Sequence, residues 1–180
     1  MELKETVIGS ETIFRGKIVT LRVDRVQMSD GSESKREIVE HKGAVCIVPV
    51  RDDGMVLMTR QFRLAAGKPL LEVPAGTLEE GEAPEMCATR ELEEETGYKA
   101  GSLRALFMAY VSPGYDTKQI RGYLATGLTP GKTHTDADEN VEVVPIPLAD
   151  VERMVLSGEI EDSKTISALL MALRLLSPPT

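Results

Sequence analysis

The sequence predicts a layered domain of the mixed α/β or α+β class, and three observations support this prediction. Strand patterns precede and surround a small number of helix patterns along the chain. The apolar run Ala44 to Val50 is typical of a strand buried in the middle of a sheet. The segment Pro84 to Thr96 has helical end signals, with Pro84 suited to a first turn and Gly97 to a C-terminus. A sheet covered by such helices forms a layered domain.

The first forty residues are expected to form strands and turns. Val19, Leu21 and Val23 alternate with polar residues, as in a strand with one buried face. Residues 29–32 have the sequence Ser-Asp-Gly-Ser, which is typical of a turn, and residues 35–40 lead into the next strand.

Further elements follow the buried run in order. Asp52-Asp53-Gly54 predicts a hairpin turn, with a return strand over Met55 to Thr59. Short strands are then expected at residues 70–73, 103–111, 120–125 and 141–146, with a polar loop over 129–140. Two helices are expected at the end of the chain, over residues 148–156 and 163–176, and Asp162 is suited to cap the second.

Composition limits the possible functions. The 180 residues suit one domain with at most a small appendage, and 29 acidic against 21 basic residues give a net charge of −8. An excess of negative charge disfavours general nucleic-acid binding and attachment to membranes through a basic patch. The two cysteines, Cys46 and Cys87, lie in apolar stretches and predict no disulfide framework. With no leader pattern and no bilayer-length apolar run, a cytoplasmic protein is expected.

One helix carries a cluster of carboxylates. Glu91, Glu94 and Glu95 are spaced i, i+3 and i+4, so they share one helix face, whereas Glu93 points to the opposite side and is expected to face solvent. Like charges on one face repel, and a hard divalent cation such as Mg²⁺ or Mn²⁺ offsets that repulsion through carboxylate oxygens. By charge alone, the alternative is a solvated acidic face.

The spacing around this cluster resembles a known family motif. The chain reads Gly76, five residues, Glu82, seven residues, and then Arg90-Glu91-Leu92-Glu93-Glu94-Glu95-Thr96-Gly97-Tyr98. This pattern resembles the Nudix box, with all seven fixed positions in register and an aromatic residue, Tyr98, where an aliphatic one is commoner. The resemblance implies the Nudix fold, in which a mixed sheet lies between helices, and a hydrolase of nucleoside diphosphates linked to another moiety.

The resemblance also implies roles for residues of the box. The metal ligands, for Mg²⁺ or Mn²⁺, would be Glu91, Glu94 and Glu95 with the main-chain carbonyl of Ala75. Arg90 would orient one of these glutamates. Gly76 is expected to let the chain turn into the loop before the helix. Glu82 belongs to the motif, and it is expected to cap or support that loop.

Segments outside the box resemble the ADP-ribose pyrophosphatase subgroup. Ser112-Pro113-Gly114, with Pro113 fifteen residues after Tyr98, is similar to the subgroup's marker, although a strand followed by Pro-Gly is also an ordinary turn. Residues 35–41, 60–63, 71–76 and 136–143 are similar to other segments of the subgroup. The substrate implied is ADP-ribose, cleaved to AMP and ribose 5-phosphate. One departure is Lys118, at about the position where many members have a glutamate.

Position by position, the resemblance implies substrate and catalytic residues. Arg63 would contact the diphosphate or terminal ribose, and Arg36 would help hold the adenine or its phosphate; the alternative for Arg36 is an ordinary surface arginine. Pro113 and Gly114 would line the substrate site. Glu139, in an acidic loop, would be the general base, ahead of Glu142 and Asp138, and its alternative is a solvated carboxylate.

The resemblance further implies a homodimer. It divides the chain into an N-terminal β extension over residues 1–41, an antiparallel sheet expected to pair with a second subunit, and a Nudix domain over 42–180. Two other functions stay open: hydrolysis of another nucleoside diphosphate sugar such as GDP-mannose, and a non-catalytic nucleotide-binding regulator. The intact carboxylate cluster argues against the regulator.

Overall fold

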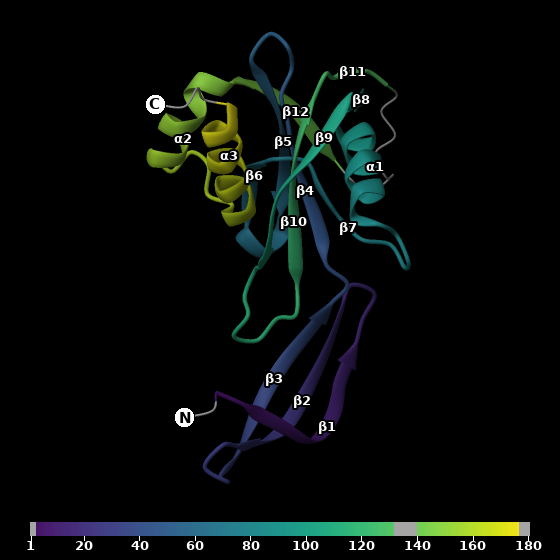
Figure 1. Ribbon diagram of the computed structural model, residues 1–180, viewed down its shortest axis with the longest axis vertical. Coiled ribbons are helices and arrows are strands. Elements are labelled where there is room, and N and C mark those ends of the chain that lie inside the picture. Colours follow the sequence, from purple (N-terminus) through teal and green to yellow (C-terminus); the bar gives the residue numbers. More distant parts are fainter. Residues whose placement is uncertain (1–2, 132–139, 177–180) are drawn as a thin grey trace. The chain divides into compact units, whose positions relative to one another are not determined.

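The computed structural model describes residues 3–131 and 140–176, which form two compact units. The first unit contains the N-terminal residues up to Gly43 together with residues 110–119, and the second contains the remainder of the chain. Figure 1 shows the element order of both units. No helix of the described ranges is long and apolar enough to cross a membrane.

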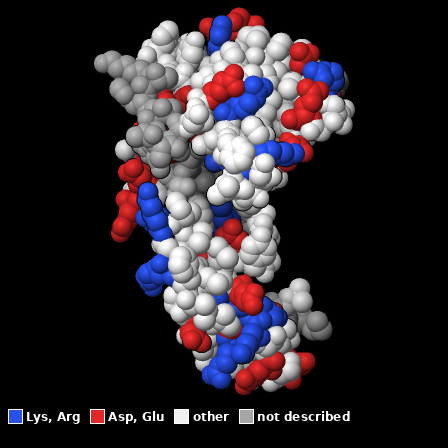
Figure 2. Space-filling view, turned by 180° about the vertical axis from the view of Figure 1, so that it is seen from behind, with Lys and Arg blue, Asp and Glu red and all other residues white. Residues whose placement is uncertain are grey.

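The first unit is built on a three-stranded antiparallel sheet. Its strands are β1 (Glu5–Arg15), β2 (Val19–Met28) and β3 (Glu33–His41), in the order β1-β2-β3. The expected turn joins β2 to β3, and Gly31 adopts a φ of 86° there. Figure 2 shows a group of Lys and Arg side chains on the visible face of this unit, with Asp and Glu side chains beside it.

The segment 110–119 joins the first unit by pairing with β3. The Val39 backbone N–H donates to the Tyr115 carbonyl at 2.7 Å, and the Thr117 N–H donates to the Val39 carbonyl at 3.0 Å. The His41 N–H donates to the Thr117 hydroxyl at 3.0 Å. This unit is therefore discontinuous in sequence.

The second unit places a mixed sheet between helices, as expected. Strand β4 (Ala44–Pro49) lies between the antiparallel β7 (Ala75–Thr77) and the parallel β10 (Gln119–Thr126), which is followed by β9 (Ser102–Tyr110). A second sheet has the order β12-β5-β6, with bounds Val141–Pro147, Met55–Arg63 and Lys68–Glu72. The short strands β8 (Tyr98–Lys99) and β11 (Thr129–Pro130) pair with each other. Thus the predicted polar loop begins with two strand residues.

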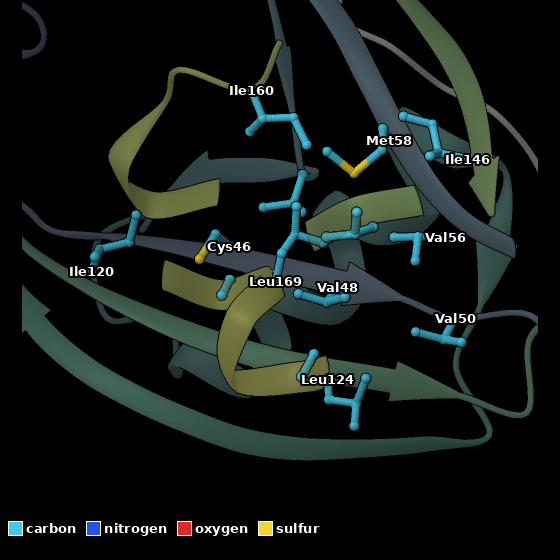
Figure 3. Close-up of a cluster of buried hydrophobic side chains, with 14 of the residues drawn as sticks. Cys46, Val48, Val50, Val56, Met58, Ile120, Leu124, Ile146, Ile160 and Leu169 are labelled. Atoms are coloured by element: carbon cyan, nitrogen blue, oxygen red, sulfur yellow. The ribbon is translucent and has the colours of Figure 1, made fainter. Parts of the chain in front are cut away.

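Strand β4 is fully buried because both of its faces are covered. Cys46 and Val48 pack with Leu169 of helix α3 (Ser163–Leu176) in one cluster of apolar side chains (Figure 3). Val45 and Ile47 pack with residues of helix α1 (Pro84–Thr96) in the other. The two clusters hold α1 and α3 against the sheet, and this arrangement fixes the position of the carboxylate helix.

Local signals set the helix ends. Pro84 occupies the first turn of α1, and Gly97 ends it in the left-handed conformation with a φ of 74°, its N–H donating to the Glu93 carbonyl at 2.8 Å. Asp162 caps α3, as predicted, because its carboxylate accepts the Thr165 N–H at 2.9 Å. The expected helix over 148–156 is instead a 3₁₀ turn, Leu148–Asp150, followed by α2 (Val151–Leu156).

Candidate active site

The Glu91 side chain of helix α1 lies close to the backbone of Gly76. Gly76 lies inside β7, opposite Val45 of β4, and it is not among the glycines with positive φ. A Cβ atom at this position would overlap the carboxylate of Glu91. The expectation that Gly76 serves the turn is therefore wrong. The reason for glycine is the close approach of the Glu91 side chain, and Gly81, with a φ of 76°, provides the turn.

Arg90 is the centre of an ion-pair network. Its Nε and Nη2 donate to the two carboxylate oxygens of Glu82 at 2.9 and 3.1 Å. Its Nη1 donates to Glu91 at 2.8 Å and to Glu94 at 2.9 Å. Arg90 therefore contacts two of the helix glutamates, where one was expected, and its bidentate bond to Glu82 was not predicted. A planar guanidinium with five N–H donors suits such a set of contacts.

Glu82 has two structural functions in this network. It binds Arg90, and its carboxylate also accepts the Glu79 backbone N–H at 3.0 Å, so it supports the loop as expected. The hydrogen bonds from Arg90 lower the pKa of Glu82 to about 2, against a smaller opposing effect of desolvation. Glu82 therefore stays ionised at neutral pH and fixes Arg90 between the loop and the helix.

The other glutamates of the helix differ in their surroundings. Glu95 is buried, and one of its oxygens accepts the Ala75 backbone N–H at 3.2 Å. The side chain of Glu91 is 12% exposed and that of Glu94 is 36% exposed. Glu93 lies away from this face, but it is half-buried and pairs with Lys99 at 3.2 Å, so the expectation that it faces solvent holds only in part.

The donor set is chemically suited to a hard divalent cation. Three carboxylates and the Ala75 carbonyl offer only oxygen atoms, which Mg²⁺ and Mn²⁺ prefer. Room for the Glu91 carboxylate exists because position 76 has no Cβ. Among residues 3–131 and 140–176, however, no three His, Cys, Asp or Glu side chains are grouped closely enough to hold an ion, and Arg90 bridges Glu91 and Glu94.

Arg63 is the last residue of strand β5 and lies near helix α1. Its Nε and Nη2 each donate to Glu72 at 2.8 Å, so the two residues form a bidentate ion pair. The hydrogen bonds to Glu72 raise the pKa of Arg63, and Glu95 adds a smaller electrostatic contribution in the same direction. Arg63 therefore lies within electrostatic reach of the carboxylate helix. Glu72 was not among the predicted site residues, although a glutamate flanked by apolar residues requires a partner when it is buried.

Three further candidates belong to the first unit. Arg36 on β3 donates from Nε and Nη2 to Glu5 on β1, at 3.0 and 2.6 Å, and from Nη1 to the Ser34 hydroxyl at 2.9 Å. Pro113 and Gly114 are exposed in the turn where the Tyr115 and Asp116 N–H groups donate to the Ser112 carbonyl. Glu139 and the acidic residues just before it lie outside the described residues.

His41 ends β3 next to this segment. Its Nδ1 accepts the Gly43 backbone N–H at 2.9 Å, which requires that nitrogen to be unprotonated. Burial lowers the pKa of His41, the positive charge of Lys118 lowers it further, and Asp116 opposes both effects. The lysine that departs from the subgroup pattern therefore lies within electrostatic reach of His41.

Two family models match this chain. Residues 40–169 match the family model described as NUDIX domain, and residues 5–39 match the model described as nucleoside diphosphate sugar hydrolase N-terminal domain. ADP-ribose pyrophosphatase from Bacillus subtilis (strain 168) is 44% identical over 169 residues, covering 93% of this chain and 91% of that protein. Methanol dehydrogenase activator from Bacillus methanolicus is 39% identical, covering 92% and 91%.

A more distant relative and a solved structure extend the comparison. GDP-mannose pyrophosphatase from Citrobacter koseri (strain ATCC BAA-895 / CDC 4225-83 / SGSC4696) is 33% identical, covering 93% of this chain and 91% of that protein. A crystal structure of ADP compounds hydrolase superimposes with a TM-score of 0.86 at 26% identity, covering 96% of this chain and 94% of the other. Members of the family generally use divalent metal ions. On its fold, its box and these matches, the chain belongs to the Nudix hydrolase family.

Proposed function

We propose that this protein hydrolyses the diphosphate of ADP-ribose, giving AMP and ribose 5-phosphate, with Mg²⁺ as its cofactor and Mn²⁺ as a possible replacement. The observation that carries the proposal is the 44% identity, over 93% of the chain, to a protein named ADP-ribose pyrophosphatase. The intact network of Arg90 with Glu82, Glu91 and Glu94 supports catalysis rather than binding alone.

The proposal gives each site residue a role. Glu91, Glu94 and Glu95 with the Ala75 carbonyl would hold the divalent cation, which supplies charge neutralisation to the diphosphate when bound. Arg90 keeps two of these glutamates oriented through its hydrogen bonds.

Residues outside the helix would bind and activate the reactants. Arg63 presents N–H donors to the diphosphate, and Arg36 together with Pro113 and Gly114 contributes to binding the nucleoside part. Glu139 would take a proton from the attacking water.

A second substrate remains an alternative within the same chemistry. The relative named GDP-mannose pyrophosphatase has lower identity, 33% against 44%, but its match covers as much of the chain. Lys118, whose charge reaches His41, would then favour a different terminal group from ribose phosphate. The non-catalytic regulator is the least supported reading, because a binding module has no need of a repulsive carboxylate cluster.

A substrate panel tests the proposal. Purified protein is incubated with Mg²⁺ and ADP-ribose, GDP-mannose or NADH, and release of the nucleoside monophosphate is measured. ADP-ribose is expected to have the highest kcat/KM, EDTA should abolish turnover and excess Mg²⁺ should restore it. Equal or faster hydrolysis of GDP-mannose would overturn the substrate assignment.

Two variants test the assigned roles. Glu95→Gln should lower kcat by about 10²-fold or more with little loss of folding. Glu139→Gln should lower kcat and leave KM nearly unchanged, because a general base contributes mainly in the transition state. Normal activity in either variant would remove that residue from its role.

We also propose a cytoplasmic homodimer in which residues 1–41 form a dimerising extension of a Nudix domain over 42–180. Support comes from β1, an edge strand of its sheet, and from the exposed apolar side chains of Val7, Ile13 and Phe14 on it. Light scattering coupled to gel filtration is expected to give twice the 19.6 kDa chain mass. A monomer at micromolar concentration would contradict the dimer.

A further inference from the structure

Four charged side chains of the second unit form a connected cluster beside the proposed site. Arg63 donates to both oxygens of Glu72, and Lys164 donates to one of them at 2.6 Å. Lys164 also donates to Asp162 at 2.8 Å. We call these four residues the charge cluster. Two cations and two anions balance in it, as buried ionic groups require.

Glu72 is the buried centre of the charge cluster. Its side chain is 2% exposed, whereas those of Lys164 and Arg63 are 16% and 40% exposed. Burial alone raises the pKa of Glu72, but the hydrogen bonds and charges of Arg63 and Lys164 outweigh burial and lower it to about 2. Glu72 is therefore a fixed anion at neutral pH, held from two sides.

The pair with Glu72 determines which donors of Arg63 remain available. Nε and one hydrogen of Nη2 are directed at the Glu72 oxygens. Both hydrogens of Nη1 and the second hydrogen of Nη2 lie outside this pair. Because the guanidinium is planar, fixing one edge fixes the direction of the other donors. A long side chain that is 40% exposed is thus oriented before any ligand arrives.

The charge cluster is anchored to the first turn of α3. Asp162 caps that helix through the Thr165 N–H, and the Thr165 hydroxyl in turn accepts the Val73 N–H at 3.0 Å. The Thr59 hydroxyl donates to the Glu72 carbonyl at 3.3 Å. Helix α3, strand β5 and the residues leading to Gly76 are therefore tied to one another around Glu72.

From this geometry we infer that Glu72, supported by Lys164, is a positioning residue that holds the Arg63 guanidinium in a fixed direction for the substrate diphosphate. The inference rests on the proposed function, because it takes Arg63 as a diphosphate ligand. The new point is that residues at the N-terminus of α3 fix the direction of the Arg63 guanidinium on β5. A rigid donor loses less conformational freedom on binding than a mobile one.

Kinetics of Glu72→Gln, Arg63→Lys and the double variant test the inference. Glu72→Gln removes the charge at nearly unchanged size, and KM should rise about 10- to 100-fold while kcat changes by less than about threefold. Arg63→Lys keeps the charge but removes the bidentate bond. The double variant should match Arg63→Lys within about twofold, because both changes remove one interaction. The inference is overturned if the KM increases of the two single variants multiply in the double variant. It is also overturned if the KM of Glu72→Gln stays within twofold of that of the parent protein.

Glu161→Gln is the matched control. Glu161 pairs with Lys68 of β6, close in sequence to α3, but both side chains are about half exposed. Its removal should leave KM and kcat unchanged. Circular dichroism melting of all variants shows whether each is folded under the assay conditions, so a loss of activity through unfolding is recognised.

A readout independent of turnover separates the two proposals. In a ¹H–¹⁵N spectrum, the Arg63 Nε–H signal, assigned by its loss in Arg63→Lys, should be sharp and slow to exchange with solvent. It should broaden or vanish in Glu72→Gln and persist in Glu161→Gln. If no nucleoside diphosphate sugar is hydrolysed by the parent protein, the proposed function fails, and this signal still decides whether Glu72 orders Arg63. A sharp signal in Glu72→Gln refutes the positioning role.

Discussion

Glu82→Gln isolates the part of the Arg90 network that supports the fold. The substitution keeps the size of the side chain and one acceptor oxygen, but it removes the charge and the second oxygen. Three hydrogen bonds are affected: two from Arg90 and one from the Glu79 backbone. Arg90 keeps its bonds to Glu91 and Glu94. We therefore expect a folded protein of reduced stability rather than an unfolded one.

The magnitude follows from the pKa of Glu82. A value of about 2 in the folded protein against 4.5 ordinarily corresponds to about 3 kcal/mol of stabilisation of the charged form at neutral pH. The Arg90 side chain is 29% exposed, and solvent there reduces the value. We expect a loss of about 2 kcal/mol in the free energy of unfolding, or roughly 4 to 8 °C in Tm for a chain of this size.

The dependence on pH gives the sharper test. Because the folded pKa of Glu82 lies below its unfolded value, its contribution is complete above about pH 4.5 and is lost as pH falls towards 2. Urea unfolding of the parent protein and of Glu82→Gln should therefore differ at pH 7 and converge near pH 2.5. Glu80→Gln, at an exposed position of the same loop, should match the parent throughout. A difference below about 0.5 kcal/mol at pH 7, or one that persists unchanged in acid, refutes this account.

Three more predictions follow from single contacts. Gly76→Ala should lower kcat/KM by at least about 10²-fold because its Cβ overlaps the Glu91 carboxylate. Gly158→Ala is the control: its φ of 78° strains alanine, but no atom is nearby, so it should cost about 1 kcal/mol of stability and no activity. Equal activities of the two variants would contradict this prediction. The pKa of the His41 imidazole, measured by NMR, should lie below 6.5, and it should be lower still in Asp116→Asn because that change removes the negative charge that raises it. An unchanged or raised pKa in Asp116→Asn would contradict this prediction. Burial raises the pKa of Cys46 and Cys87 to about 12, so a thiol reagent at pH 8 should label neither in the folded protein and both in guanidinium; rapid native labelling would disprove it.

Elements with local signals could be predicted from the sequence. The apolar run of β4 and the ends of α1 at Pro84 and Gly97 were identified correctly because each depends on neighbouring residues. The bounds of β1 could not be predicted in the same way. Its pairing with β2 is interrupted by irregularities between Val7 and Gly9 and between Thr12 and Phe14, and ten of its eleven residues are exposed. Both features remove the alternation by which a strand is recognised.

Site residues that act through distant partners were also missed. The box identified Arg90 and the glutamates of α1, since their spacing is that of one helix. The function of Gly76 depends on Glu91, and that of Glu72 depends on Arg63, nine residues away, and Lys164, 92 residues away. No pattern within one strand or helix encodes such pairs, because tertiary packing creates them.

The discontinuous first unit has a consequence for the newly made chain. Strand β3 leaves the ribosome well before segment 110–119, and the bond from His41 to Thr117 spans 76 residues. At a synthesis rate of about 5 to 20 residues per second, the outer edge of β3 stays unpaired for roughly 4 to 15 s until that segment is made. During this interval its N–H and C=O groups are open to other strands. Nascent chains on one messenger are therefore exposed to mispairing at β3, and completion of the first unit depends on prior synthesis of β9.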